Sequence, residues 1–332
     1  NVSVTATTAI KRISVELPTS VSNGSVSAIA NGTTYTNSFV VDYGTKVTIN
    51  ATANTGYHLN SLKNGNTNIT SGTIITATST ISITCSFVIN TYTISITQPS
   101  ANGTITVTSA GENHTSNFTV THGTTIKIVA TPSTGYSFKS LLVNNSSFTS
   151  GNSMTVTSNV SIVGTTSANS YLITITQPSN GTVSAVYNNN TYTSSFYANY
   201  GSTVKVSISA NTGYHVTGLT WNGSSVTSGS TQTVTGNLTL TGAVSINTYT
   251  LSVTNPTGAK FAILYQGRWY YSFPLNIVAH GSTIRVQLDA DTGYQIDSIK
   301  LGSTSITNGS DHTITSDASI TATTSLKTYT IT

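Results

Sequence analysis

Hydrophobic and polar residues alternate along most of the chain. In the segment TVKVSIS, the apolar residues Val204, Val206 and Ile208 share one face, and polar residues occupy the other. The segment TIRVQLDA, which begins at Thr283, follows the same pattern. Alternation with a period of two is typical of strands that bury one face. Since no stretch shows a sustained helical period, the pattern predicts an all-β protein.

Three short markers recur at a nearly constant spacing, which identifies an internal repeat. The triplet Thr-Gly-Tyr, a glycine preceded by Tyr or His, and a proline after an opening strand each occur four times. The first two markers advance together, in steps of 79, 78 and 80 residues. Each repeat is expected to hold about six to eight short strands. The markers are Tyr57, Tyr136, Tyr214 and Tyr294; Gly44, Gly123, Gly201 and Gly281; and Pro18, Pro99, Pro178 and Pro256.

The markers divide the chain into four repeats and two end fragments. Val2 and Val4 align with the closing strand of each repeat, so the first fragment is expected to close a preceding repeat. Tyr329 and Ile331 align with the opening strands, so the last fragment is expected to open a following one. The joints are short, which predicts repeats stacked as a stiff rod within a longer array. The repeats are 11–90, 91–169, 170–247 and 248–327, and the fragments are 1–10 and 328–332.

The motifs around the Thr-Gly-Tyr triplet carry a resemblance to a known family. In each repeat the triplet tyrosine is followed by two apolar positions, two and five residues further on. With the opening strand and the Tyr-Gly strand, this order resembles the divergent internalin B-repeat, or Listeria–Bacteroides repeat. The family often has Trp at the last position, where this chain has Leu or Ile. The positions are Tyr57, Leu59 and Leu62; Tyr136, Phe138 and Leu141; Tyr214, Val216 and Leu219; and Tyr294, Ile296 and Ile299.

The resemblance implies a fold and a general role. The fold would be a small β-grasp-like or β-sandwich module. Such modules serve as spacers, stalks or adhesive elements of bacterial, archaeal or phage surface proteins, and they carry no catalysis.

The composition adds a low charge to this picture. Only 6% of residues are charged and 36% are hydrophobic, so the chain is expected to fold rather than stay disordered. A net charge of +4 is too small for a nucleic-acid footprint, and no apolar run is long enough for a membrane span. A polar but uncharged surface is insensitive to salt, which suits a protein outside the cell.

No charged residue, histidine or cysteine keeps its place through all four repeats, which argues against an enzyme and against a cofactor. Asp289, Asp291 and Asp297 are close enough in sequence for a calcium site, but the other repeats have no matching acids, which favours a solvated strand end. The histidines that flank the markers are replaced by Ser, Gln or Tyr elsewhere, so surface or turn roles are expected. These histidines are His58, His122, His215 and His280.

The single cysteine, Cys85, aligns with Ala6, Gly164, Gly242 and Ala322. All five residues are small. The position is therefore expected to need a small side chain, and Cys85 is interpreted as a packed thiol.

A cluster of aromatic residues distinguishes the fourth repeat. Trp269 aligns with Tyr35 and Tyr192, and Phe273 with Phe39 and Phe196, so both are expected to be structural. Arg268, Tyr270 and Tyr271 have no counterparts, and two interpretations stay open for them. They contact a sugar or a protein partner, or they pack against the neighbouring repeat, which is favoured.

Several Asn-x-Ser/Thr sequons fall at predicted hairpin tips, where a glycan would not disturb the core. We expect glycosylation sites, if the host glycosylates, at Asn31, Asn113, Asn189 and Asn222.

These observations favour a non-catalytic structural or adhesive array on a prokaryotic cell surface, such as a stalk or filament. The alternatives are a phage or virus head or tail fibre, and a glycan-binding module centred on the fourth repeat. The expected partners are further repeats or copies of the same protein and a surface glycan or protein. Nucleic acid and direct insertion into a membrane are not expected.

Overall fold

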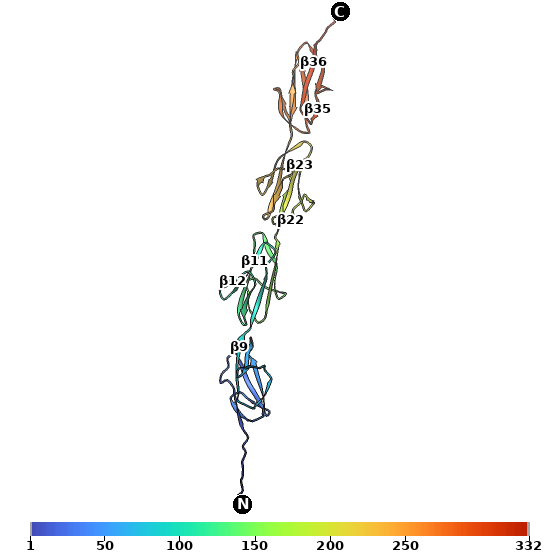
Figure 1. Ribbon diagram of the computed structural model, residues 1–332. Helices are drawn as coiled ribbons and strands as arrows, with labels where there is room; N and C mark the ends of the chain where they lie inside the picture. The colour runs from blue at the N-terminus through green and yellow to red at the C-terminus, as the bar shows by residue number, and fades with distance from the viewer. Residues whose placement is uncertain (1, 331–332) are drawn as a thin grey trace. The chain divides into compact units, whose positions relative to one another are not determined.

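The computed structural model describes residues 2–330, and all regular secondary structure in this range is β. The chain forms two compact units, Asn1–Ser167 and Ala168–Thr332, and each unit contains two repeats. Every strand is hydrogen-bonded only to strands of its own repeat. Figure 1 follows this organisation along the colour bar, with the first repeat in blue and the fourth in red.

The two repeats of the first unit have nine strands each. The first repeat contains β1 (Arg12–Glu16), β2 (Gly24–Ala30), β3 (Thr33–Tyr35), β4 (Phe39–Asp42), β5 (Lys46–Ala53), β6 (Tyr57–Asn64), β7 (Thr67–Asn68), β8 (Thr73–Thr76) and β9 (Ile81–Ile89). The second contains β10 (Thr91–Thr97), β11 (Gly103–Ser109), β12 (Glu112–His114), β13 (Phe118–Thr121), β14 (Thr125–Pro132), β15 (Tyr136–Val143), β16 (Ser146–Ser147), β17 (Ser153–Thr155) and β18 (Val160–Ala168).

The second unit repeats this series. The third repeat contains β19 (Ser170–Thr176), β20 (Gly181–Tyr187), β21 (Asn190–Tyr192), β22 (Phe196–Asn199), β23 (Thr203–Ala210), β24 (Tyr214–Trp221), β25 (Ser224–Ser225), β26 (Thr231–Thr233) and β27 (Leu238–Ile246). The fourth contains β28 (Thr248–Val253), β29 (Ala259–Tyr265), β30 (Arg268–Tyr270), β31 (Leu275–Ala279), β32 (Ser282–Ala290), β33 (Tyr294–Leu301), β34 (Thr304–Ile306), β35 (Ser310–Ile314) and β36 (Ala318–Leu326).

Each repeat is a sandwich of a five-stranded and a four-stranded sheet. In the first repeat the strand orders are β4-β1-β9-β6-β7 and β3-β2-β5-β8, and the other repeats have the same orders. The opening strand β1 and the closing strand β9 are parallel neighbours, with Val15 opposite Ile81. The other strand pairs of this repeat are antiparallel.

The prediction of an all-β tandem array is confirmed. Of the two modules that the resemblance implied, the chain adopts the β-sandwich, because the second layer is a four-stranded sheet and no helix occurs in residues 2–330. Each repeat has more strands than expected, since strands of two or three residues, such as β3 and β7, are too short to show an alternating pattern. Residues 2–10 and 328–330 form no strand, so their pairing with further repeats stays a prediction. Ile331 lies outside the described residues.

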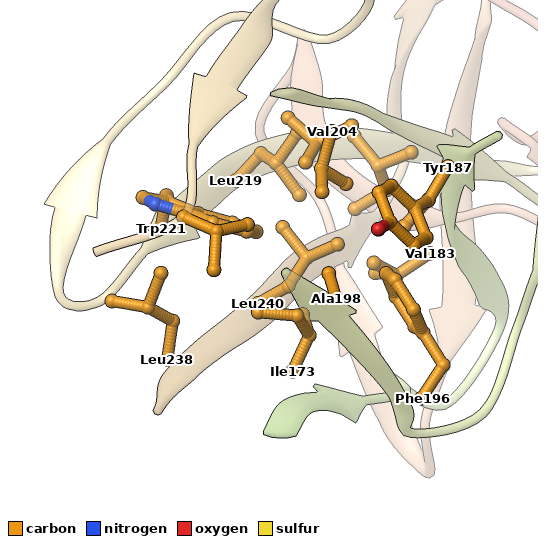
Figure 2. Close-up of a cluster of buried hydrophobic side chains, with 14 residues drawn as sticks. Ile173, Val183, Tyr187, Phe196, Ala198, Val204, Leu219, Trp221, Leu238 and Leu240 are labelled. Carbon is orange, nitrogen blue, oxygen red and sulfur yellow. The ribbon is translucent and has the colours of Figure 1, made fainter. Parts of the chain in front are cut away.

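Each repeat buries its own hydrophobic core between its two sheets. The alternation found in TVKVSIS is confirmed, because Val204, Val206 and Ile208 all belong to the core of the third repeat. Figure 2 shows that core, with Trp221 at one end, the ring of Phe196 at the other and aliphatic side chains between them. Burying each large aliphatic side chain contributes about 1.5–3 kcal/mol, so these clusters hold the sheets together.

The Thr-Gly-Tyr triplet forms a tight turn before a strand of the five-stranded sheet. In the first repeat the backbone N–H of Tyr57 donates to the carbonyl of Asn54 (3.0 Å), and Gly56 between them has a φ of 85°. A positive φ at the third position is the geometry of a type II turn, which strongly favours glycine. The same bond joins Tyr294 to Asp291 in the fourth repeat. The marker recurs because the turn recurs.

The position of Cys85 is restricted to small residues, as predicted. Cys85 lies opposite Leu62 in its sheet, and Gly242 lies opposite Leu219 in the equivalent pair. A Cβ on Gly164 would come within 2.8 Å of Ile105 Cδ1 and of Phe138 Cε1. Cys85 itself is half-buried against the core, and burial raises the pKa of its thiol.

We expect Gly164→Ala to destabilise the second repeat by about 1–3 kcal/mol, because the added methyl overlaps two core side chains. Calorimetry of the whole chain would show one thermal transition at a lower temperature. The matched control is Gly236→Ala, since a Cβ there meets no atom within 4 Å. Equal melting profiles for the two variants would contradict the packing argument.

Candidate functional site

A single residue joins the first repeat to the second. Asn90 lies between the closing strand β9 and the opening strand β10. Its backbone N–H donates to the carbonyl of Gly56 (2.8 Å), and its own carbonyl accepts the backbone N–H of His122 (2.8 Å). Both backbone groups of the joint residue are therefore bonded, one to each repeat, which restricts the path of the chain at this point.

Side chains reinforce the same joint. The imidazole Nδ1 of His58 lies 2.8 Å from Oδ1 of Asn90, and it must be the donor because the amide oxygen only accepts. The ring of His122 covers Gly56, where a Cβ would come within 2.6 Å of the ring carbon Cγ. The ring centroids of His122 and Tyr92 are 6.0 Å apart, in a tilted arrangement. Gly56 is thus required by its turn and by the ring packed on it.

The second unit contains a copy of this joint between the third and fourth repeats. The backbone N–H of Asn247 donates to Gly213 (2.8 Å), and the N–H of His280 donates to Asn247 (2.9 Å). His215 Nδ1 lies 2.8 Å from Asn247 Oδ1, and the ring of His280 covers Gly213. Here the hydroxyl of Tyr249 also lies 3.2 Å from Nδ1 of His280. Because the same geometry occurs at two joints, it is a recurring structural feature of the repeat.

The backbone bonds of the joint do not depend on histidine. The N–H of Tyr200 donates to Asn169 (2.8 Å), the N–H of Tyr43 to Lys11 (2.8 Å), and the N–H of Lys327 to Gly293 (2.8 Å). A bulky aromatic or imidazole ring precedes the marker glycine in every repeat. The repeats therefore share this backbone hydrogen bond and a ring before the marker glycine, whereas the other side chains of the joint differ.

The histidines were expected to have surface or turn roles, and His122 and His280 do lie in turns. Both are half-buried in the joints, and His122 Nδ1 is buried without a hydrogen-bond partner among the described residues. Sequence reasoning missed the joint because its members lie about 32 residues apart. One signal was present: the segment Ile-Asn-Thr-Tyr-Thr occurs at both 89–93 and 246–250.

The outer face of the four-stranded sheet of the fourth repeat carries a row of large side chains. Trp269 on β30 lies opposite Leu264 on β29, which lies opposite Arg285 on β32. Arg285 in turn lies opposite Asp311 on β35. The guanidinium and the carboxylate form a two-pronged pair, with Nε to Oδ1 at 2.7 Å and Nη2 to Oδ2 at 3.0 Å. This pair lowers the pKa of Asp311, chiefly through the hydrogen bond from Arg285.

The structure corrects the alignment of the aromatic hairpin in this repeat. Tyr192 lies opposite Ala185, and the equivalent partner of Ile263 is Tyr270, not Trp269. Likewise Leu275, not Phe273, lies opposite Leu251, in the place that Phe196 takes in the third repeat. Tyr265 to Tyr270 is as long as Tyr187 to Tyr192, so Tyr270 keeps the spacing of the third repeat. The fourth repeat has two extra residues between Tyr270 and Gly281, and one of them lies before Leu275, which moves Phe273 out of the place of Phe196.

Of the three residues predicted to contact a ligand, Arg268 and Tyr270 lie together, and ligand contact by the three stays a prediction. Tyr270 is half-buried against the core, and the Arg268 guanidinium carbon lies 5.3 Å from the centre of its ring. Tyr271 follows β30 and is 70% exposed. Trp269, which was expected to be structural, is 39% exposed, so the exposed aromatic side chains are Trp269 and Tyr271.

The acidic residues of the fourth repeat have separate partners. Asp289 accepts a hydrogen bond from Gln287 (3.0 Å), and Asp297 accepts one from Ser325 (2.8 Å). Asp317 accepts the backbone N–H of Thr250 (2.8 Å), a role that Asn237 has in the third repeat. Within residues 2–330, no three His, Cys, Asp or Glu side chains are grouped so that they could hold a metal ion.

The four predicted glycosylation sites are all exposed. Asn31, Asn189 and Asn222 lie at hairpin tips, where positive φ angles of 51°, 62° and 50° suit asparagine. Asn113 is the middle residue of β12, two residues after the hairpin tip, and accepts a hydrogen bond from the hydroxyl of Thr108 (2.7 Å). Their glycosylation stays a prediction.

Comparison with known proteins identifies the repeat. Residues 22–91 and 92–170 each match the model of the divergent InlB B-repeat domain. The first two repeats are thus identified as divergent InlB B-repeat domains. The third and fourth repeats have the same strand orders as the two matched ones.

Solved structures add only a distant likeness. The Bacillus anthracis TIE protein is 9% identical, with a TM-score of 0.40 over 93% of this chain and 67% of that one. A likeness at that level carries no argument about function. No curated protein sequence matches this chain. Among residues 2–330, no helix is long and apolar enough to span a membrane.

In the third repeat a tryptophan lies close to the position where the InlB B-repeat family often carries one. Leu219 stands at that position in the third repeat and is buried. Trp221, two residues further along β24, is 8% exposed and belongs to the same core. In this repeat the large aromatic side chain in the core is thus Trp221, at the next core-facing position of the strand (Figure 2).

We expect Gly56→Ala to weaken the joint between the first two B-repeats. The variant carries about 1–2 kcal/mol of backbone strain at positive φ, and its methyl also displaces the His122 ring. Gly44→Ala is the matched control, because Gly44 has a φ of 88° but open space around its Cβ position. Hydrogen exchange at the backbone amides of Asn90 and His122 should accelerate only in Gly56→Ala. Equal protection in both variants would show that the ring contact has no influence on the joint.

We expect the Arg285–Asp311 pair to give a small pH-dependent stabilisation. Because the pKa of Asp311 is lowered in the folded state, the stabilisation is present above the ordinary carboxyl pKa and is lost as the pH falls through the lower, folded value. Asp311→Asn should therefore lower the melting temperature at pH 7 and have no effect in strong acid. A difference that persists undiminished at pH 2 would contradict this assignment.

Proposed function

We propose that the chain is a non-catalytic spacer of an extracellular surface protein, in which tandem B-repeats set a distance between functional parts. The family supports a surface repeat protein in general. The joint supports the spacer role in particular: at Asn90 and at Asn247, one residue connects two repeats and is bonded to both. A chain built for free movement between domains would have longer and less bonded linkers.

The surface composition agrees with this role. Among residues 2–330, two ion pairs occur, Arg12–Asp42 and Arg285–Asp311. The joints depend on backbone bonds and ring packing, neither of which is screened by salt. A spacer outside the cell meets changing ionic strength, and a joint of this kind keeps its geometry through such changes.

The proposal extends to a prokaryotic stalk or filament, with further repeats or copies of the same protein as partners. The sequons at exposed hairpin tips would add glycans without disturbing the sheets. A phage or virus fibre needs the same mechanical properties. The full-length gene distinguishes the two, because a signal peptide and a wall or membrane anchor belong only to the cell-surface protein.

Small-angle X-ray scattering of the whole chain tests the spacer role. We expect the scattering of a stiff, elongated particle that is unchanged between low and high salt. The double variant Gly56→Ala, Gly213→Ala should become measurably more flexible. Its control, Gly72→Ala with Gly229→Ala, alters two positive-φ glycines that have open space at the Cβ position and lie outside the joints, and should scatter like the natural chain. A compact or fully flexible natural chain would refute the spacer role.

A further inference from the structure

The outer sheet face of the fourth repeat differs from the equivalent face of the other three. Where the fourth repeat has the row Trp269, Leu264, Arg285 and Asp311, the third has Thr191, Val186, Lys205 and Thr231. The first repeat has Thr34, Ile29, Thr48 and Ile74. The strands and their register are the same, so the side chains of this row are not required by the fold.

Two exposed aromatic side chains lie on the edge strand β30 and directly after it. Trp269 on β30 is 39% exposed, and Tyr271, the first residue after β30, is 70% exposed. Exposing a Trp ring costs free energy that a Thr at the same place avoids, as the third repeat demonstrates. Flat rings with an apolar face and a polar edge are suited to partners of the same mixed character.

Planar polar groups lie on the same face as Trp269, on the far side of Leu264. Arg285 and Asp311 are each about half exposed, and their pairing holds both groups in one orientation. The pairing engages Nε and Nη2 of Arg285, so an incoming hydroxyl can accept from the Nη1 amine and donate to a carboxylate lone pair. Gln287 and Asp289, on the same face of β32, offer a second fixed amide and carboxylate.

We propose that this face binds a neutral carbohydrate chain. A β-linked pyranose has axial C–H groups that form apolar faces, which stack on aromatic rings, and equatorial hydroxyls that both donate and accept. The face offers the matching pattern, with the ring of Trp269 at one edge, Leu264 next to it, and oriented donors and acceptors beyond Leu264. The charge of Arg285 is balanced by Asp311, which favours a neutral sugar over an acidic one. The sheet is open, so the site accommodates the length of a polysaccharide.

The experiment uses the whole chain with two soluble probes, cellohexaose and chitohexaose. Binding is measured by calorimetry and by tryptophan fluorescence. The chain has two tryptophans, and Trp221 is buried in the third repeat, so a change in emission or in acrylamide quenching reports on Trp269. We expect saturable binding of at least one probe and protection of Trp269 from the quencher.

The variants separate stacking from folding. Trp269→Ala and Tyr271→Ala should each weaken binding roughly tenfold or more, and Trp269→Phe should restore part of it. Tyr197→Ala is the control, because Tyr197 is 66% exposed on the other sheet of the third repeat and should leave binding unchanged. The quenching measurement on the natural chain needs no variant and stays decisive if a variant folds poorly.

Three outcomes would overturn the proposal. The first is no binding of either probe, and the second is binding that Trp269→Ala leaves intact. The third is self-association of the chain that Trp269→Ala abolishes without any sugar binding, which would assign the face to a second copy. None of these outcomes affects the spacer role, because that role depends on the joints and is tested by scattering.

Discussion

The hydrogen bond from the joint asparagine to the turn glycine is the interaction on which the array depends. Gly56 has to be glycine for its turn, and the same missing side chain makes room for the His122 ring of the next repeat. Its carbonyl then accepts the N–H of Asn90. Gly56 thus serves both the turn within its repeat and the contact with the next repeat. A substitution at Gly56 would therefore affect both.

Much of the fold could be predicted from the sequence because it rests on local rules. Period-two alternation located the long strands, and the spacing of Thr-Gly-Tyr located the repeats, since the type II turn requires glycine wherever it occurs. The small position at Cys85 followed from comparing repeats, and Gly242 confirms its alignment by its place opposite Leu219. These features are decided within a few residues of chain.

The joint and the aromatic hairpin could not be predicted in the same way. The contact of His58 with Asn90 joins residues 32 positions apart, and neither residue is unusual by itself. In the fourth repeat two extra residues follow Tyr270, and matching Phe273 with Phe196 across them assigned Trp269 to the core place that Tyr270 takes. Only the strand pairing reveals which ring faces inward. The exposed row from Trp269 to Asp311 also crosses three strand pairs, so no pattern within a single strand predicts it.

The parallel pairing of the opening and closing strands has a mechanical consequence. A pull along the chain enters a repeat at the N-terminal end of its opening strand and leaves at the C-terminal end of its closing strand. Because β10 and β18 are parallel neighbours, with Ile94 opposite Val160 and Thr97 opposite Val163, such a pull slides one strand along the other. The bonds of this ladder then bear the load together, whereas a hairpin pulled from its open end breaks its bonds one at a time. Each repeat is therefore arranged to resist tension along the direction in which the chain runs.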